Sequence, residues 1–207
     1  MSSTNRGYDR HTADYYVTPK QPVIDFLKKF VLIEGIQKPS DLNWLDPCCG
    51  GDENNDPTYT TVIKELYKPT KICGIDIRED SKADVIMNYL DCEVENMSNH
   101  NIIISNPPFY LAEEFIRKSL EFVEDGGYVI MLLRLNFFGS TKRKELFDKF
   151  MPKYCFIHHK RINFIPDSMK KEMKAQGIKP PSGDSIEYAH FVWQKGYKSD
   201  YTKTYLL

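Results

Sequence analysis

The amino-acid sequence predicts an α/β fold with a doubly wound, mostly parallel sheet and helices on both of its faces. Short apolar runs of strand length alternate with amphipathic runs of helix length along most of the chain, which is the pattern of successive βαβ units. Glycines, prolines or carboxylates directly follow several of the apolar runs. Ligands of such a sheet bind beyond the carboxyl ends of the strands, so these residues are the candidates for a functional site.

The first half of the chain contains two predicted helices and several short predicted strands. Apolar residues recur at helical spacing between Val23 and Val31, and Pro19 suits the start of a helix, so a helix is predicted over residues 20–34. A second helix is predicted near residues 57–67. Short apolar runs predict strands at residues 42–45, 72–75, 85–86 and 102–104.

The second half continues the alternation and then becomes irregular. The pattern from Ala112 to Val123 is that of an amphipathic helix, which Asp125-Gly126-Gly127 ends. Prolines, glycines and lysines interrupt residues 160–187, as in a substrate-facing loop. The remaining predicted elements are a helix at residues 142–150 and strands at residues 128–133, 154–157 and 188–194.

The composition favours one domain over residues 1–207, because 207 residues with 41% hydrophobic content suffice for one substantial core. No run approaches the roughly 20 apolar residues that cross a bilayer. The N-terminus lacks the apolar stretch of a signal peptide. We therefore expect a cytoplasmic protein without a membrane partner. The five cysteines include no C-x-x-C pair, which favours reduced thiols over disulfides or a metal site.

The net charge of −1 conceals an uneven distribution. Residues 1–139 carry 14 lysines and arginines against 22 aspartates and glutamates, whereas residues 140–180 carry 11 against 4. A basic block of this kind can supply phosphate contacts to a nucleic acid. A solvated lysine-rich surface is the alternative on charge alone.

Two predicted strands end in residues that suit a small ligand. The first ends in Asp46-Pro47-Cys48-Cys49-Gly50-Gly51, whose glycines allow close approach to the backbone. This is neither a P-loop nor a G-x-G-x-x-G pattern, and the carboxylates of residues 52–56 favour a cationic or zwitterionic ligand over phosphate. The second ends at Asp76, where an acid can accept both hydroxyls of a ribose. A structural turn and a helix N-cap are the alternatives for these two sites.

A third predicted strand ends in Asn106-Pro107-Pro108-Phe109, which has the groups needed for chemistry on an amino group. The prolines stiffen the turn and fix its carbonyl groups. The side-chain oxygen of Asn106 and the carbonyl of Pro107 can accept the two N–H bonds of an adenine amino group and direct its lone pair toward an electrophile. Phe109 can stack on a base that has left its helix.

These motifs resemble those of the class I S-adenosylmethionine-dependent methyltransferases, and most closely the small phage or prophage DNA adenine-N6 methyltransferases. The resemblance covers most of the chain and includes the order of the motifs. It implies a Rossmann-like methyltransferase fold with a seven-stranded sheet whose last strand is antiparallel. It also implies S-adenosyl-L-methionine as the cofactor. The first motif departs from the family pattern, because Gly50-Gly51 runs straight into an acidic loop.

The resemblance assigns roles residue by residue. Asn106, Pro107, Pro108 and Phe109 are the implied catalytic motif, and Asn106 also faces the cofactor. Asn88 by pattern and Asp91 by charge are the two candidates for the adenine contact of the cofactor. The remaining implied cofactor-binding residues are Tyr16, Thr18, Pro19, Asp46, Pro47, Cys48, Gly50, Asp76 and Ile77.

The implied reaction is methyl transfer to the N6 amino group of a flipped adenine in DNA. Residues 160–187 are then a small target-recognition insert, and the basic segment contacts the phosphate backbone. The candidate nucleic-acid contacts are Lys142, Arg143, Lys160, Arg161, Lys170, Lys171 and Lys174. Four alternatives are an RNA adenine-N6 methyltransferase, a protein glutamine methyltransferase, an N4-cytosine methyltransferase, and a non-catalytic subunit that binds the cofactor or nucleic acid.

Overall fold

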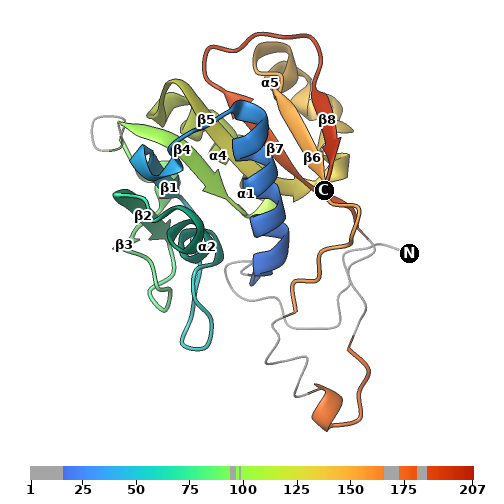
Figure 1. Ribbon diagram of the computed structural model, residues 1–207. Coiled ribbons are helices and arrows are strands. Elements are labelled where there is room, and N and C mark those ends of the chain that lie inside the picture. Colours follow the sequence, from blue (N-terminus) through green and yellow to red (C-terminus); the bar gives the residue numbers. More distant parts are fainter. Residues whose placement is uncertain (1–15, 94–96, 98, 166–172, 181–185) are drawn as a thin grey trace.

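The computed structural model describes residues 16–93, 97, 99–165, 173–180 and 186–207. Within this part of the chain an eight-stranded sheet has the strand order β3-β2-β1-β4-β5-β7-β6-β8. Helices cover both faces of the sheet (Figure 1), so the predicted doubly wound α/β fold is confirmed. The helices are α1 (Lys20–Glu34), α2 (Thr58–Tyr67), α4 (Ala112–Phe122) and α5 (Lys144–Lys149). The strands are β1 (Asn43–Asp46), β2 (Lys71–Asp76), β3 (Val85–Ile86), β4 (His100–Ser105), β5 (Val123–Arg134), β6 (Tyr154–Ile157), β7 (Tyr188–Gln194) and β8 (Lys203–Leu206).

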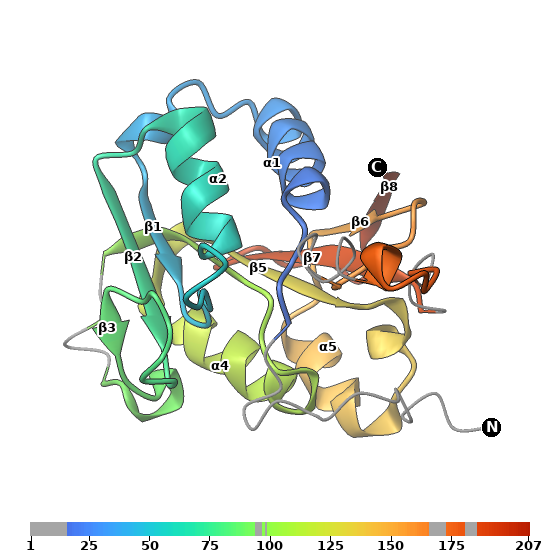
Figure 2. The same ribbon diagram turned by 90° about the horizontal axis from the view of Figure 1, so that it is seen from below.

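The two faces of the sheet carry separate apolar layers. Figure 2 shows α1 and α2 on one side of the sheet and α4 and α5 on the other. Successive residues of a strand point to opposite faces, and in β4 Ile102 and Ile104 pack with α1 and α2 while Ile103 packs with α4. All three side chains are fully buried. This double burial explains the continuous apolar run of residues 102–104 in β4.

The junction between α4 and β5 differs from the prediction. The helix ends at Phe122, and β5 begins at Val123, which pairs with His100. The register then shifts, so that Ile102 pairs with Tyr128 and the intervening residues bulge. A Cβ atom on Gly127 would lie 2.8 Å from the Asn101 carbonyl oxygen. The glycines therefore accommodate a close approach inside the strand rather than a loop between two elements.

The described part of the sheet has one strand more than the seven predicted. The strand predicted as last and antiparallel, residues 188–194, is antiparallel as expected. The antiparallel strand is β7, which lies between β5 and β6. The additional strand β8 pairs in parallel with β6 at the edge of the sheet. Its four residues are mostly exposed, so no apolar run marks it. Backbone pairing, together with Tyr205 stacked on Phe156 at 5.1 Å, holds it in place.

The described part of the segment 160–187 is largely irregular. Residues 173–180 project away from the sheet on the side where α1 begins (Figure 1), and only residues 173–175 are helical. The role of the segment as a target-recognition insert stays a prediction. None of the helices in the described ranges has the length and apolar character to cross a membrane.

Candidate functional site

A cavity of about 250 Å³ lies at the carboxyl ends of β1, β2 and β4. Its walls are the turn after β1 (residues 47–51), the end of β2 (residues 76–78), the segment after β4 (residues 106–111) and the segment before α1 (residues 16–18). β1, β2 and β4 run parallel, so their carboxyl ends lie side by side at the same end of the sheet. The structure thus brings together three motifs that lie up to 60 residues apart in the sequence.

Asn106 presents an unsatisfied acceptor within this cavity. Its Nδ2 donates a hydrogen bond of 3.0 Å to Oγ1 of Thr18. Its Oδ1 is buried and has no hydrogen-bond partner among the described residues. Buried polar atoms are nearly always paired, so an unpaired one in a cavity is a strong sign of a missing donor. The amide is therefore held by one end and available at the other.

Phe109 belongs to an aromatic cluster beside Asn106. Its ring centroid lies 5.8 Å from that of Tyr188. Phe164 packs edge-on against Tyr188 at 5.0 Å, and Tyr16 lies 6.3 Å from Phe164. Phe109 and Tyr16 line the cavity. The segment before α1 and the turn after β4 thus supply rings to the cavity wall, and the buried rings of Tyr188 and Phe164 lie behind them.

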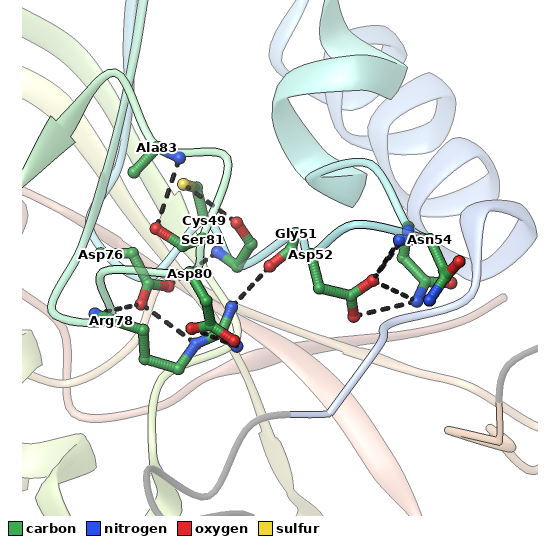
Figure 3. A network of polar contacts seen from close by, with 11 residues as sticks. Cys49, Gly51, Asp52, Asn54, Asp76, Arg78, Asp80, Ser81 and Ala83 are labelled. Atoms are coloured by element: carbon green, nitrogen blue, oxygen red, sulfur yellow. Dashed lines mark hydrogen bonds and ion pairs between the residues drawn. The ribbon is translucent and has the colours of Figure 1, made fainter.

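Asp76, the last residue of β2, accepts a hydrogen bond from the turn that follows β1. Its Oδ2 accepts a hydrogen bond of 2.8 Å from the Gly50 amide, and its Oδ1 accepts one of 2.9 Å from the Arg78 amide. Figure 3 shows the Arg78 side chain beside Asp76 and reaching Gly51. The guanidinium lies 3.4 Å from Asp76 and donates a hydrogen bond of 2.6 Å to the Gly51 carbonyl. Arg78 is buried and lines the cavity, but no pattern in the sequence singled it out.

Asp46 lies beneath the cavity rather than on its wall. Its Oδ1 accepts hydrogen bonds from Ser105 Oγ at 2.6 Å and from the Cys48 amide at 3.2 Å. Its Oδ2 is buried without a partner among the described residues. Burial raises the pKa of this carboxyl to about 7, although the bonds from Ser105 and Cys48 lower it. A cation bound above it would favour the ionised form.

Hydrogen bonds within the acidic loop after Gly51, and an ion pair with Lys82 outside it, offset part of the charge of the loop. Asp52 Oδ1 accepts hydrogen bonds of 2.8 Å from the backbone amides of Asn54 and Asn55, and Figure 3 shows this closed turn. Asp56, which lines the cavity, forms an ion pair of 2.9 Å with Lys82. Gly51 has a φ of +84°, and a Cβ there would lie 2.9 Å from Pro57. The second glycine is therefore required for the turn itself.

The remaining cofactor candidates divide into two groups. The cavity wall includes Tyr16, Thr18, Pro47, Cys48, Ile77 and Asn88. Pro19 and Asp91 do not line it: Pro19 caps α1, and the Asp91 carboxylate accepts a hydrogen bond of 2.9 Å from Asn88 Nδ2. Of the two candidates for the adenine contact, Asn88 thus lines the cavity, and Asp91 accepts a hydrogen bond from it.

The thiols at this site are protonated. Burial raises the pKa of Cys48 well above its ordinary value, and the carboxylates of Asp46 and Asp76 raise it further. A thiolate nucleophile is therefore not available at neutral pH. Within the described residues no group of three or more histidine, cysteine or carboxylate side chains could hold a metal ion.

The predicted nucleic-acid contacts have different environments. Lys142, Lys160 and Lys174 are exposed. Arg143 instead donates a hydrogen bond of 2.8 Å to the Phe137 carbonyl, and Arg161 lies 3.6 Å from Glu187. Lys170 and Lys171 lie outside the described residues. The structure thus leaves the three exposed lysines as candidates and gives the two arginines contacts within the protein.

Comparison with solved structures places the fold in a known group. A Listeria monocytogenes protein assigned to the class I S-adenosylmethionine-dependent methyltransferases superimposes with a TM-score of 0.61 at 16% identity, over 92% of this chain and 65% of that one. The M protein of the type I restriction enzyme EcoKI gives 0.59 at 15% identity, over 92% of this chain and 48% of that one. The tRNA m1G37 methyltransferase of M. jannaschii gives 0.54 at 16% identity, over 88% and 52%.

The chain thus spans less than two thirds of the length of each of these three proteins. No protein-family model matches the sequence, and no curated protein sequence matches it. At identities of 15–16% the likeness concerns the fold. The chain has the Rossmann-like fold of the class I S-adenosylmethionine-dependent methyltransferases.

Proposed function

We propose that this protein transfers a methyl group from S-adenosyl-L-methionine to the N6 amino group of adenine in DNA. The observation that carries the proposal is the buried Oδ1 of Asn106, which has no partner among the described residues and belongs to a residue of the same cavity wall as the Pro47–Gly51 turn and Asp76. An acceptor without a donor at this position suits a substrate amino group.

The cavity fits a nucleoside with a positively charged side chain. Asp76 lies at the end of β2, where an acid can accept ribose hydroxyls, and its carboxylate is already oriented by Gly50 and Arg78. Ile77 and Asn88 provide an apolar and a polar contact nearby. The unpaired Oδ2 of Asp46 favours positive charge above it. When bound, S-adenosyl-L-methionine supplies a methyl group on a sulfonium.

Asn106 prepares the amino group for methyl transfer. The amino nitrogen of adenine is a poor nucleophile, because its lone pair is delocalised into the ring. Asn106 Oδ1 and the Pro107 carbonyl oxygen accept its two N–H bonds, and these bonds localise the lone pair on nitrogen. Thr18 holds the amide nitrogen of Asn106, so the side chain is oriented before the substrate arrives. Such preorganised acceptors cost no rearrangement during the reaction.

The aromatic wall receives the base. Phe109 and Tyr16 line the cavity and can stack on a planar ring, and the buried Tyr188 and Phe164 pack behind them. Base-aromatic stacking contributes about 1–3 kcal/mol per base. The acceptor Oδ1 of Asn106 is buried, so a base that remains paired in a duplex would not reach it. The proposed substrate is therefore an adenine flipped out of its helix or already single-stranded.

Two observations support a nucleic-acid substrate. The neighbours in fold include the M protein of a type I restriction enzyme and a tRNA methyltransferase. The chain also carries exposed lysines in the basic segment 140–180. Both observations are compatible with an RNA substrate as well as with DNA, so adenine in RNA is the second candidate substrate. Glutamine in a protein, N4 of cytosine and a non-catalytic role are outcomes that the following test distinguishes.

The test is incubation with methyl-labelled S-adenosyl-L-methionine and separate DNA, RNA and protein pools, followed by nucleoside and peptide mass spectrometry. We expect labelled N6-methyladenine from DNA. Asn106→Ala should lower the rate about 10²–10³-fold, as removal of a catalytic hydrogen-bond partner does. Asn43→Ala, at the opposite end of β1, should keep the rate. Label in the RNA or protein pool instead of DNA would show that the proposed substrate is wrong. Cofactor binding without methyl transfer to any pool would favour a non-catalytic subunit.

A further inference from the structure

Arg134 is a half-buried cation for which the described residues supply no acid partner. It is the last residue of β5, at the carboxyl end of the sheet. Its guanidinium lies 5.0 Å from the centroid of the Phe109 ring. Its Nε is buried and has no hydrogen-bond partner among the described residues. A buried polar atom without a partner is costly, and more so when it carries charge.

The nearest acid along the strand pair is engaged elsewhere. Arg134 pairs in register with Tyr188 of β7, and Glu187 precedes Tyr188. The Glu187 carboxylate lies 3.6 Å from Arg161 and is more than half exposed. In the described ranges no carboxylate is within ion-pairing distance of Arg134. The contact with the Phe109 ring offsets only part of the cost of desolvating the guanidinium.

We propose that Arg134 binds a phosphate of the nucleic-acid strand next to the target base, an inference that rests on the proposed function. A guanidinium that stacks on a ring keeps its N–H edge free, and this planar edge matches phosphate oxygens in a bidentate manner. A base that stacks on Phe109 brings its own phosphates close, because one sugar separates base from phosphate. Arg134 thus reads the charged backbone of the nucleotide whose base Asn106 and Phe109 hold.

The first experiment compares Arg134→Met with Arg117→Met. Both changes remove one positive charge, but Arg117 lies on α4 and pairs with Glu113 at 2.8 Å. Binding of fluorescein-labelled DNA and RNA oligonucleotides of the same sequence is measured by anisotropy across a range of salt concentrations. We expect Arg134→Met to weaken binding about tenfold, the loss of one charge-assisted hydrogen bond. The slope of log K against log salt should fall by about 0.9 for duplex DNA and about 0.7 for a single strand. Arg117→Met should change neither.

The second experiment removes the charge from the nucleic acid instead. Oligonucleotides carry one neutral methylphosphonate at successive positions around the methylated adenine. The affinity of the wild-type protein should fall when the methylphosphonate occupies one particular position beside the adenine. The Arg134→Met variant should bind that oligonucleotide and the unmodified one with equal affinity. Arg134→Lys should restore the salt slope but not the full affinity, since a lysine cannot form the bidentate contact.

The outcomes separate this inference from the proposed function. If the wild type methylates adenine and Arg134→Met keeps the wild-type salt slope, the Arg134 contact is wrong and the function stands. If the wild type binds and methylates no nucleic acid, the proposed function fails and the inference fails with it. Cofactor affinity, measured by calorimetry, should be equal in all variants and so reports that each is folded.

Discussion

Asp46 illustrates, at the scale of a residue, how burial sets protonation. One of its oxygens accepts two hydrogen bonds, and the other has no partner in the described part of the chain. Burial raises its pKa from an ordinary value of 3.8 to about 7. The folded protein therefore holds a proton that the unfolded chain releases between these pH values. Stability from this proton is complete below pH 3.8 and is lost as pH rises through about 7.

Asp46→Asn provides the test, because asparagine imitates the protonated acid. As pH rises from 4 to above 7, the free energy of unfolding of the wild type should decrease relative to that of the variant, because this is the range between the ordinary and the raised pKa of Asp46. Thermal or urea unfolding across this range measures the difference. The affinity of the wild type for S-adenosyl-L-methionine should also rise over this range, and that of the variant should not. Parallel pH profiles for the two proteins would contradict the assignment.

Thr18 positions Asn106 and should affect turnover more than binding. Thr18→Val removes the acceptor of the 3.0 Å bond from Asn106 Nδ2 while keeping the shape of the side chain. A lost hydrogen bond of about 1 kcal/mol corresponds to a rate about fivefold lower. We expect this loss in kcat for methyl transfer, with little change in KM for the cofactor. Thr18→Ser should restore the rate, and a change confined to KM would exclude the positioning role.

A buried polar chain joins three elements beneath the site. Hydrogen bonds of 2.8 Å connect Tyr59 of α2 with His190 of β7, and His190 with His158 at the end of β6. Phe26 of α1 stacks on His190 at 4.0 Å. Burial lowers the pKa of His158 to about 4 and that of His190 well below its ordinary value. The two rings are therefore neutral in the folded protein and tie the α1 and α2 layer to the sheet.

The hydrogen-bonded chain of Tyr59, His190 and His158 predicts that the stability of the fold decreases in acid. The two histidines bind protons in the unfolded chain at about pH 6.5 but not in the folded protein, so their stabilising effect is complete above pH 6.5 and is lost as pH falls toward about 4. Each contributes a slope of up to about 1.4 kcal/mol per pH unit. His158→Gln should flatten the dependence of unfolding free energy on pH, measured with urea. The exposed His159→Gln is the control, and an equal slope in both variants would refute this account.

The distribution of charge over the whole molecule sets its salt dependence. Residues 140–180 carry 11 basic residues against 4 acidic ones, while residues 1–139 carry 14 against 22. An overall charge near zero removes long-range attraction to nucleic acid, so contact depends on the basic segment alone. The interface should therefore be local and strongly screened by salt.

Simultaneous Lys170→Gln, Lys171→Gln and Lys174→Gln changes test this distribution. Binding should weaken for all sequences, and the salt slope should fall by about 0.9 for each lysine that contacts a duplex phosphate. Lys28→Gln, Lys29→Gln and Lys38→Gln, which remove three exposed lysines elsewhere, are the matched control. An unchanged slope in the first triple variant would remove these lysines from the interface.

The fold could be predicted because its signals are local. The helix over residues 20–34 and the strand over residues 188–194 were predicted with the bounds that α1 and β7 have in the structure. Periodicity marked these elements, since each buries one face or both. The edge strand β8 has mostly exposed residues and no such mark. Pairing with β6 creates it, and pairing is a property of the assembled sheet.

The sequence by itself determined the order of the elements and the nature of the strand-end motifs, because apolar period and turn chemistry depend on near neighbours. Only the tertiary structure decided what those motifs meet. Tyr59 bonds His190 across 131 residues, and Asn106 bonds Thr18 across 88. The positions of Arg78 against Gly51 and of Arg134 against Phe109 likewise follow from the way separate strands end at one edge. Contacts of this range arise from packing and leave no periodic trace in the chain.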